Sequence, residues 1–177
     1  MIDRQRYPAM ETSFANGGQL SASNAEVWNR WATVWRGILD MTNPASPLLV
    51  NPSPSWHKYS WFAEFIAAIP RYRANTIATT RMAIHARRLL FDVAEKEKID
   101  FGLERRGILH LYNDRAAFEH GLRVSRLLRE GGLERRTVTS AEMRVLEPAL
   151  THDYYGGIFT PDDATGDIHR FTRGLAA

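Results

Sequence analysis

The pattern of apolar and polar residues predicts helices in the first half of the chain. Apolar residues recur at helical spacing over residues 26–40, at Val27, Trp31, Val34 and Ile38. Ser23 or Asn24 is the expected N-cap of this helix. Four prolines within residues 41–54 predict an extended crossing segment. Two further helices are expected over residues 56–69, where Pro70 should end the first, and over residues 74–98.

The second half of the chain predicts short strands between helices. Residues 107–112 and 154–160 have strand character, and residues 161–166 predict a turn. Asn113 or Asp114 should cap a helix that runs to Arg129 and ends at two glycines. Thr139 and Glu142 have the spacing of a capping box, which predicts a short helix to Leu146. No complete βαβ unit is found, so the pattern indicates an α+β fold.

Composition narrows the class of protein without identifying it. The 177 residues are 44% hydrophobic and 24% charged, as in ordinary globular proteins. The absence of cysteine excludes disulfides, thiolate metal ligands and cysteine nucleophiles. A net charge of +3 gives no reason to expect nucleic-acid binding. The chain start has no apolar signal region, and no apolar run is long enough to span a bilayer, so we expect a cytoplasmic location.

The first candidate site is the loop Glu11-Thr-Ser-Phe-Ala-Asn-Gly-Gly-Gln-Leu-Ser21. Its hydroxyls, its asparagine and its two glycines could surround a phosphate or the polar edge of a flavin ring, because glycine lets a ligand approach the backbone. On composition alone an ordinary surface loop is favoured. The loop is neither a Walker sequence nor a GxGxxG fingerprint.

Other candidates are weaker. Asp3 could end a strand as the ribose-binding acid of a dinucleotide fold does, a signal that any exposed aspartate satisfies. Carboxylates in residues 161–170 could bind a cation or form an acid/base pair, although a turn with Asp167 near the N-cap of the next helix is the simpler interpretation. The six histidines lack metal-ligand spacing, and no G-x-S-x-G is present. The arginine pairs at 87–88, 105–106 and 135–136 are expected on solvated faces.

The aromatic segment Trp56–Arg73 has two interpretations. Aromatic residues with basic flanks are typical of a segment at a membrane interface. Core packing with a few basic side chains that reach solvent is the alternative, and it is slightly favoured.

The string Glu-Thr-Ser-Phe-Ala-Asn-Gly-Gly-Gln-Leu-Ser resembles the flavin loop of bacterial D-amino acid dehydrogenases, which belong to the FAD-dependent family of D-amino acid oxidase and glycine oxidase. The strings Arg144-Val-Leu-Glu-Pro148 and Pro161-x-Asp-x-Thr-Gly-Asp167 agree with that family in the same order. The resemblance implies the edge of a Rossmann-like FAD-binding domain in residues 1–25, a substrate or cap domain in residues 26–165, and a return segment in residues 166–177. It also implies an internal fragment that lacks the N-terminal GxGxxG and the C-terminal half.

The resemblance assigns FAD contacts to nine residues. The ribose would be held by Asp3 beside Arg4, and the pyrophosphate would be approached by Thr12 and Ser13. The isoalloxazine would be followed by Asn16, Gly17, Gly18, Gln19 and Leu20. No residue of the chain is assigned as a catalytic base or a metal ligand, because hydride transfer from a neutral amine requires neither.

The implied reaction is oxidative deamination of a D-amino acid to a 2-oxo acid and ammonia, with electrons passing to a respiratory acceptor. Trp56–Arg73 is then the expected contact with the inner face of the cell membrane or with a quinone. An oxidase that uses oxygen directly stays open, and so does the substrate side chain. The alternative from another class is a non-enzymatic, mildly basic helical module that docks a partner or a membrane through the aromatic helix.

Overall fold

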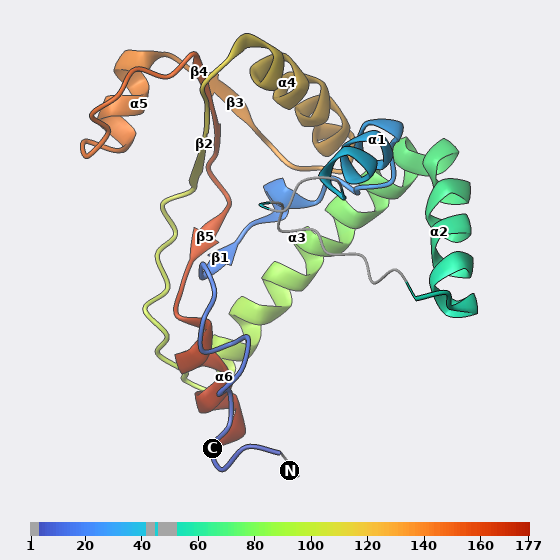
Figure 1. Ribbon diagram of the computed structural model, residues 1–177. Coiled ribbons are helices and arrows are strands. Elements are labelled where there is room, and N and C mark those ends of the chain that lie inside the picture. The colour runs from blue at the N-terminus through green and yellow to red at the C-terminus, as the bar shows by residue number, and fades with distance from the viewer. Residues whose placement is uncertain (1–3, 42–44, 46–52) are drawn as a thin grey trace. The chain divides into compact units, whose positions relative to one another are not determined.

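The computed structural model describes residues 4–41, 45 and 53–177, which form a mixture of helices and short antiparallel strands (Figure 1). Contacts divide the chain into two units, unit 1 (Met1–Glu26 and Ile77–Ala177) and unit 2 (Val27–Thr76). Most of the expected segment 41–54, like Asp3, lies outside the described residues. The mixed helix-and-sheet class expected from the sequence is confirmed.

Unit 1 contains two small sheets. The first has the order β2-β4-β3, with both pairs antiparallel, and is built from β2 (Ile108–Tyr112), β4 (Gly156–Thr160) and β3 (Arg136–Val138). The second pairs β1 (Gln19–Leu20) with β5 (Ala164–Thr165). In Figure 1 the chain runs directly from β4 into β5, so one segment joins the two sheets. Strands β2 and β4 confirm the predictions for residues 107–112 and 154–160.

The helices of unit 1 are α4 (Arg115–Glu130), α5 (Ser140–Leu146), α6 (Ile168–Ala176) and most of α3 (Tyr72–Lys96). Three of them, α4, α5 and α6, begin where their local sequence predicts, and α3 begins two residues before its predicted start at residue 74. The carboxylate of Asp114 accepts a hydrogen bond from the amide of Ala117, and Asp167 caps α6 by accepting from the amide of Arg170. Thr139 and Glu142 form the predicted capping box, in which each side chain accepts from the other's backbone amide.

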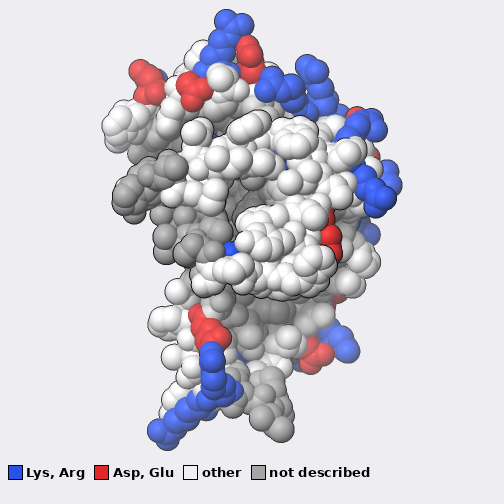
Figure 2. Space-filling model, turned by 45° about the vertical axis from the view of Figure 1, so that its right-hand side comes forward, with Lys and Arg blue, Asp and Glu red and all other residues white. Residues whose placement is uncertain are grey.

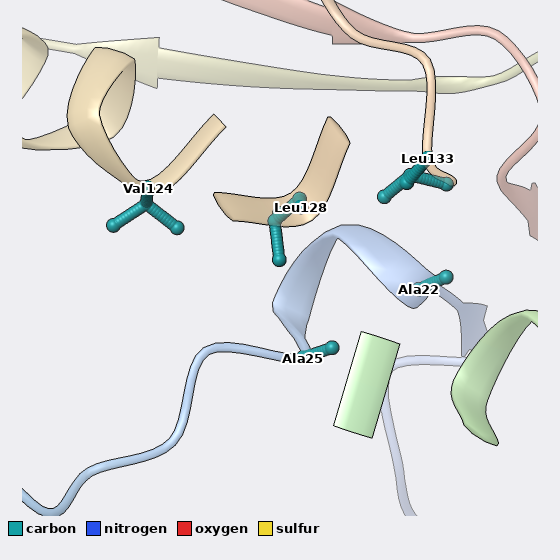
Figure 3. Packing of buried hydrophobic residues seen from close by; sticks show 5 residues of the cluster. All are labelled: Ala22, Ala25, Val124, Leu128 and Leu133. Atoms are coloured by element: carbon teal, nitrogen blue, oxygen red, sulfur yellow. The ribbon is translucent and has the colours of Figure 1, made fainter. Parts of the chain in front are cut away.

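The apolar core of unit 1 lies between α4 and a short 3₁₀ turn, η1 (Ala22–Asn24). Val124 and Leu128 point from α4 toward Ala22 and Ala25, and Leu133 closes the cluster (Figure 3). Burial of these side chains fixes the place of η1, which directly follows the glycine-containing loop.

Unit 2 contains α1 (Trp31–Asp40), α2 (Trp56–Ala68) and the 3₁₀ turn η2 (Ile69–Arg71), which leads into α3. Pro70 ends α2 through this turn, as expected. The side-chain amide of Asn29 donates to the carbonyl oxygen of Phe65 over 3.2 Å, which ties α2 to the segment before α1. Neither α1 nor α2 has a buried residue.

Two predictions from the pattern were wrong, and some strands were not predicted at all. The first helix begins at Trp31, with Arg30 as its N-cap, whereas the expected N-caps Ser23 and Asn24 lie in η1. Strands β1, β3 and β5 were not expected, and β5 lies within the predicted turn 161–166, since segments of two or three residues are strands only through their partners. The core interpretation of the aromatic segment also fails here, because Trp56 and Trp61 of α2 are 85% and 53% exposed.

Candidate functional site

The glycine-containing loop is held in shape by its own asparagine. The side-chain amide of Asn16 donates to the carbonyl oxygens of Thr12 and Ser13, both over 3.0 Å. Its side-chain oxygen accepts a hydrogen bond from the amide of Gly18 over 2.7 Å. The Asn16 side chain therefore folds the loop onto itself, a role that the sequence does not reveal.

The two glycines of the loop have different surroundings. Gly18 has a φ of +60°, and a Cβ placed on it would lie 2.5 Å from the carbonyl oxygen of Gly166. The amide of Gly166 in turn donates to the carbonyl oxygen of Gly18 over 2.9 Å. At Gly17 a Cβ would meet nothing within 4 Å, so its backbone is open to a ligand. Gly18 thus serves the β1–β5 contact, whereas Gly17 presents an open backbone.

A polar cavity of about 450 Å³ lies at the start of the described chain. Its lining residues include Arg4, Thr12 and Ser13, three of the sequence-predicted site residues. The guanidinium of Arg4 forms an ion pair with Glu11. The cavity volume falls within the range of ligand sites, and its hydroxyls and guanidinium are suited to phosphate or ribose oxygens.

Helix α6 covers the other side of the loop. The rings of Phe14 and His169 meet edge to face with centroids 5.1 Å apart, and the hydroxyl of Thr172 lies 3.4 Å from that of Ser13. The ring of His169, one of the six histidines without metal-ligand spacing, is thus packed against the loop.

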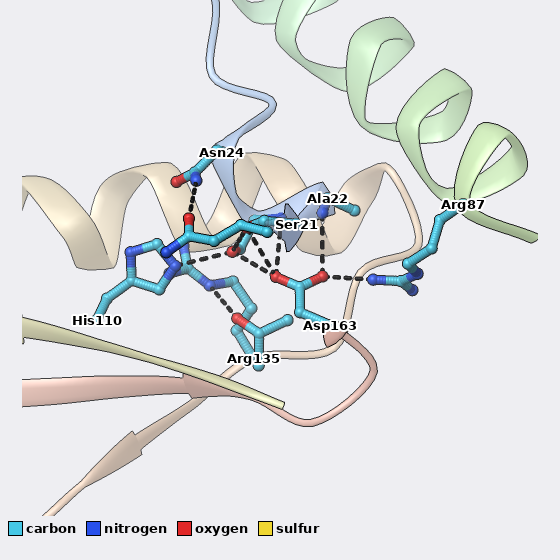
Figure 4. Close-up of polar contacts among 10 residues, drawn as sticks. Ser21, Ala22, Asn24, Arg87, His110, Arg135 and Asp163 are labelled. Carbon is cyan, nitrogen blue, oxygen red and sulfur yellow. Dashed lines mark hydrogen bonds and ion pairs between the residues drawn. The ribbon is translucent and has the colours of Figure 1, made fainter. Parts of the chain in front are cut away.

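A buried polar cluster lies directly after β1 (Figure 4). Asp163 is fully buried, and its carboxylate accepts from the amides of Ala22 and Ser23 and from the hydroxyls of Ser21 and Ser23. It also forms an ion pair with Arg87. Arg87 and Arg135 were expected on solvated faces, and for these two residues the prediction was wrong. Local sequence could not reveal this, since Asp163 is 76 residues from Arg87.

His110 extends this cluster into the larger sheet. Its Nε2 lies 2.8 Å from the hydroxyl of Ser23, whose own proton points to Asp163 over 2.5 Å. The carboxylate of Asp163 thus contacts the hydroxyl of Ser23 rather than the imidazole of His110. In a hydrolase triad the carboxylate orients the imidazole, so these three residues do not form one.

Two pKa values in the cluster are shifted. Burial lowers the pKa of His110 from its ordinary value of 6.5, the guanidinium of Arg135 lowers it further, and Asp163 opposes the shift. Burial also lowers the pKa of Arg135, which the phenol of Tyr112 and the carboxylate of Asp163 oppose. Arg135 donates to the hydroxyls of Thr160 and Ser125 over 3.0 and 3.2 Å, and its remaining Nη2 is buried without a hydrogen-bond partner.

The carboxylates of residues 161–170 do not form a cation site. Asp163 is engaged as described, Asp167 caps α6, and Asp162 is exposed. Within the part of the chain that the structure describes, no group of three or more histidine, aspartate or glutamate side chains could hold a metal ion. The same residues contain no helix long and apolar enough to cross a membrane.

Curated relatives match nearly the whole chain. It is 60% identical to D-amino acid dehydrogenase 3 of Mesorhizobium japonicum over 175 residues, covering 99% of this chain and 42% of that protein. It is 38% identical to a D-amino acid dehydrogenase of Paramagnetospirillum magneticum, covering 100% of this chain and 43% of that protein. The chain thus spans less than half the length of either relative.

A solved structure and a family model agree with these relatives. Glycine oxidase from Geobacillus kaustophilus superimposes with a TM-score of 0.50 at 20% identity, covering 93% of this chain and 33% of that chain, which supports the fold. The model of the family described as FAD dependent oxidoreductase matches residues 1–177. The chain therefore belongs to the FAD dependent oxidoreductase family.

Proposed function

We propose that the chain contributes part of the FAD site and part of the substrate domain of an enzyme that oxidises D-amino acids. The observation that carries the proposal is the 60% identity to a D-amino acid dehydrogenase, which runs through the glycine-containing loop. The open backbone at Gly17 and the polar cavity beside Thr12 and Ser13 fit a large, partly anionic cofactor. When bound, FAD supplies the electron-accepting chemistry.

Each sequence-predicted residue has a role in this proposal. The cavity side chains Arg4, Thr12 and Ser13 contact the ribose and pyrophosphate, with Asp3 on the ribose. The loop backbone from Asn16 to Leu20 follows the ring system, and the Asn16 side chain holds the loop in that shape. The proposed domains are those expected from the sequence: residues 1–25 belong to the FAD domain, 26–165 to the substrate domain, and 166–177 return to the FAD domain.

This chain's residues would act by binding and orientation. The loop would shield the bound cofactor from water, and hydroxyl and amide donors would hold it in place. The product of oxidation is an imino acid, which water converts to a 2-oxo acid and ammonia. No side chain of the chain is proposed as a base, since a neutral amine needs no deprotonation before it loses hydride.

The decisive experiment uses a chimera in which residues 1–177 replace the matching segment of the Mesorhizobium japonicum protein. We expect the purified chimera to bind FAD, and its visible flavin absorbance to be bleached anaerobically by D-amino acids and not by the L-enantiomers. The intact Mesorhizobium japonicum protein is the control for expression and assay. A chimera that folds but takes up no flavin, while the control does, contradicts the proposal. Rapid reoxidation by oxygen would identify an oxidase, and slow reoxidation a dehydrogenase.

The aromatic helix α2 supports a second, separate proposal, contact with the membrane surface. Trp56, Tyr59 and Trp61 are each more than half exposed, and Lys58 lies over the Tyr59 ring with 5.4 Å from its Nζ to the ring centroid. Aromatic rings with adjacent lysines are suited to the interface of an anionic bilayer. Figure 2 shows lysine and arginine side chains exposed on the surface. We propose a cytoplasmic location together with this contact, so that α2 would meet the inner face of the cell membrane.

Flotation of the chimera with anionic liposomes tests the membrane proposal. Replacing Trp56 and Trp61 with serine should reduce the floated fraction severalfold. The matched control is Val145→Ser, because Val145 is an apolar residue that is 81% exposed in unit 1. Equal flotation of both variants and the unchanged protein would contradict membrane contact through α2. Membrane binding without flavin uptake would instead favour the non-enzymatic docking module.

A further inference from the structure

Asp163 stabilises a turn that lies far from it in sequence. The amides of Ala22 and Ser23 open the turn η1, and Ser21, its N-cap residue, makes no capping hydrogen bond with its own side chain. The carboxylate of Asp163 takes that place, accepting from these amides over 3.0 and 3.3 Å. Without it, two buried backbone donors would lose their acceptor.

The residues after Asp163 hold the other end of the same segment. Ala164 and Thr165 pair with Leu20 and Gln19, and the amide of Gly166 donates to the carbonyl oxygen of Gly18. Residues 163–166 therefore fix the backbone on both sides of β1. The proposed flavin contacts Gly18, Gln19 and Leu20 are thus held by residues 164–166, and Asp163 holds the turn that follows them.

Arg87 holds the carboxylate of Asp163 in place. Its side chain is 10% exposed and pairs with Oδ1, the oxygen that also accepts from Ala22. The Oδ2 oxygen accepts from Ser21 and Ser23. Each oxygen has its own set of donors, so rotation of the carboxylate would break several hydrogen bonds at once.

The position of Asp163 joins the proposed FAD loop to the larger sheet. Asp163 follows Thr160, the last residue of β4, by three positions, and Ser23 is hydrogen-bonded to His110 of β2. We infer that Asp163, oriented by Arg87, is a positioning residue that fixes the backbone of residues 18–23 in the shape that accepts FAD. This inference rests on the proposed function.

The test compares Asp163→Asn with Asp162→Asn, because Asp162 is the exposed neighbour of Asp163. A third variant, Asp163→Asn with Arg87→Met, removes the buried guanidinium that the first leaves unpaired. Ser23→Ala is the mildest change and removes only hydroxyl contacts. Amide hydrogen exchange of residues 19–24 is measured in the 177-residue chain, and the dissociation constant and visible circular dichroism of FAD are measured in the chimera.

We expect faster exchange at residues 19–24, an FAD dissociation constant raised about tenfold and an altered flavin dichroism in both Asp163 variants. The Asp162 variant should match the unchanged protein, and Ser23→Ala should fall between them. The inference is overturned if the double variant folds and its amide exchange, FAD affinity and flavin dichroism are all unchanged. If neither Asp163 variant folds, the same three unchanged measurements in Ser23→Ala overturn it. If the unchanged chimera binds no FAD, the proposed function fails, whereas altered exchange alone shows that Asp163 still holds the turn.

Discussion

The imidazole Nε2 of His110 lies 2.8 Å from the hydroxyl of Ser23, 87 residues earlier in the chain. This hydrogen bond connects β2 to the turn that follows the glycine-containing loop. The ring is partly buried beside Arg135, so a positive charge on it is unfavourable in the folded chain.

Stability should therefore fall as the solution becomes acidic. The pKa of His110 is lower in the folded chain than the ordinary value of 6.5, so the unfolded chain binds this proton more tightly. The contribution of neutral His110 to the free energy of unfolding is fully present above about pH 6.5, and it is lost as the pH falls toward the pKa of His110 in the folded chain. The free energy of unfolding, measured in urea, should thus decrease between pH 7.5 and pH 5, and this decrease should be smaller in His110→Gln than in the unchanged chain. His152→Gln, at an exposed histidine, is the control, and an equal decrease in all three would contradict the prediction.

The second prediction concerns the capping box of α5. Thr139 accepts a hydrogen bond from the amide of Glu142, and the amide and hydroxyl of Thr139 hold the pKa of Glu142 below its usual range. Thr139→Ala should lower the free energy of unfolding by about 1 kcal/mol. Thr139→Ser keeps the capping hydroxyl and should lower the free energy of unfolding much less. Urea unfolding measures both. Equal stability of the two variants would show that the cap contributes little.

Features set by neighbouring residues could be predicted from the sequence, and features set by distant partners could not. The caps at Asp114, Thr139 and Asp167 depend on residues three positions away, so their spacing is visible in the chain. The burial of Arg87 depends on Asp163, which no local pattern indicates. The expected N-cap at Ser23 or Asn24 was wrong for the same reason, because these residues lie in η1, which Asp163 stabilises.

The candidate site shows the same division. The loop string identified the family, and the structure brings three of the residues predicted to contact FAD, Arg4, Thr12 and Ser13, to one cavity. The internal role of the Asn16 side chain and the different surroundings of Gly17 and Gly18 depend on the folded backbone. The assignment of FAD contacts to these residues stays a prediction.

The third prediction contrasts Arg87, whose side chain is 10% exposed, with the buried Arg135. Arg87→Met leaves the carboxylate of Asp163 buried without its ion-pair partner and should cost about 3–5 kcal/mol. Arg135→Met removes a guanidinium whose Nη2 has no hydrogen-bond partner, and it should change stability by about 1 kcal/mol or less, since removal of a buried charge can be neutral. Urea unfolding of the two variants provides the comparison. A larger loss at Arg135 would show that its bonds to Ser125 and Thr160 outweigh the cost of burial.

The last prediction separates the two glycines of the loop. Gly18→Ala forces a side chain onto a backbone with a φ of +60° and toward the carbonyl oxygen of Gly166, so it should destabilise the chain by about 1–3 kcal/mol. Gly17→Ala meets open space and should leave the free energy of unfolding within about 0.5 kcal/mol. If the flavin ring passes over Gly17, the added methyl group occupies its path, and the chimera carrying Gly17→Ala should bind FAD at least about tenfold more weakly although it is equally stable. Unfolding in urea and titration with FAD measure the two effects independently. Unchanged FAD affinity in Gly17→Ala would show that the ring does not pass over Gly17. The added methyl group meets no protein atom within 4 Å, so weaker FAD binding could not be attributed to a displaced neighbour.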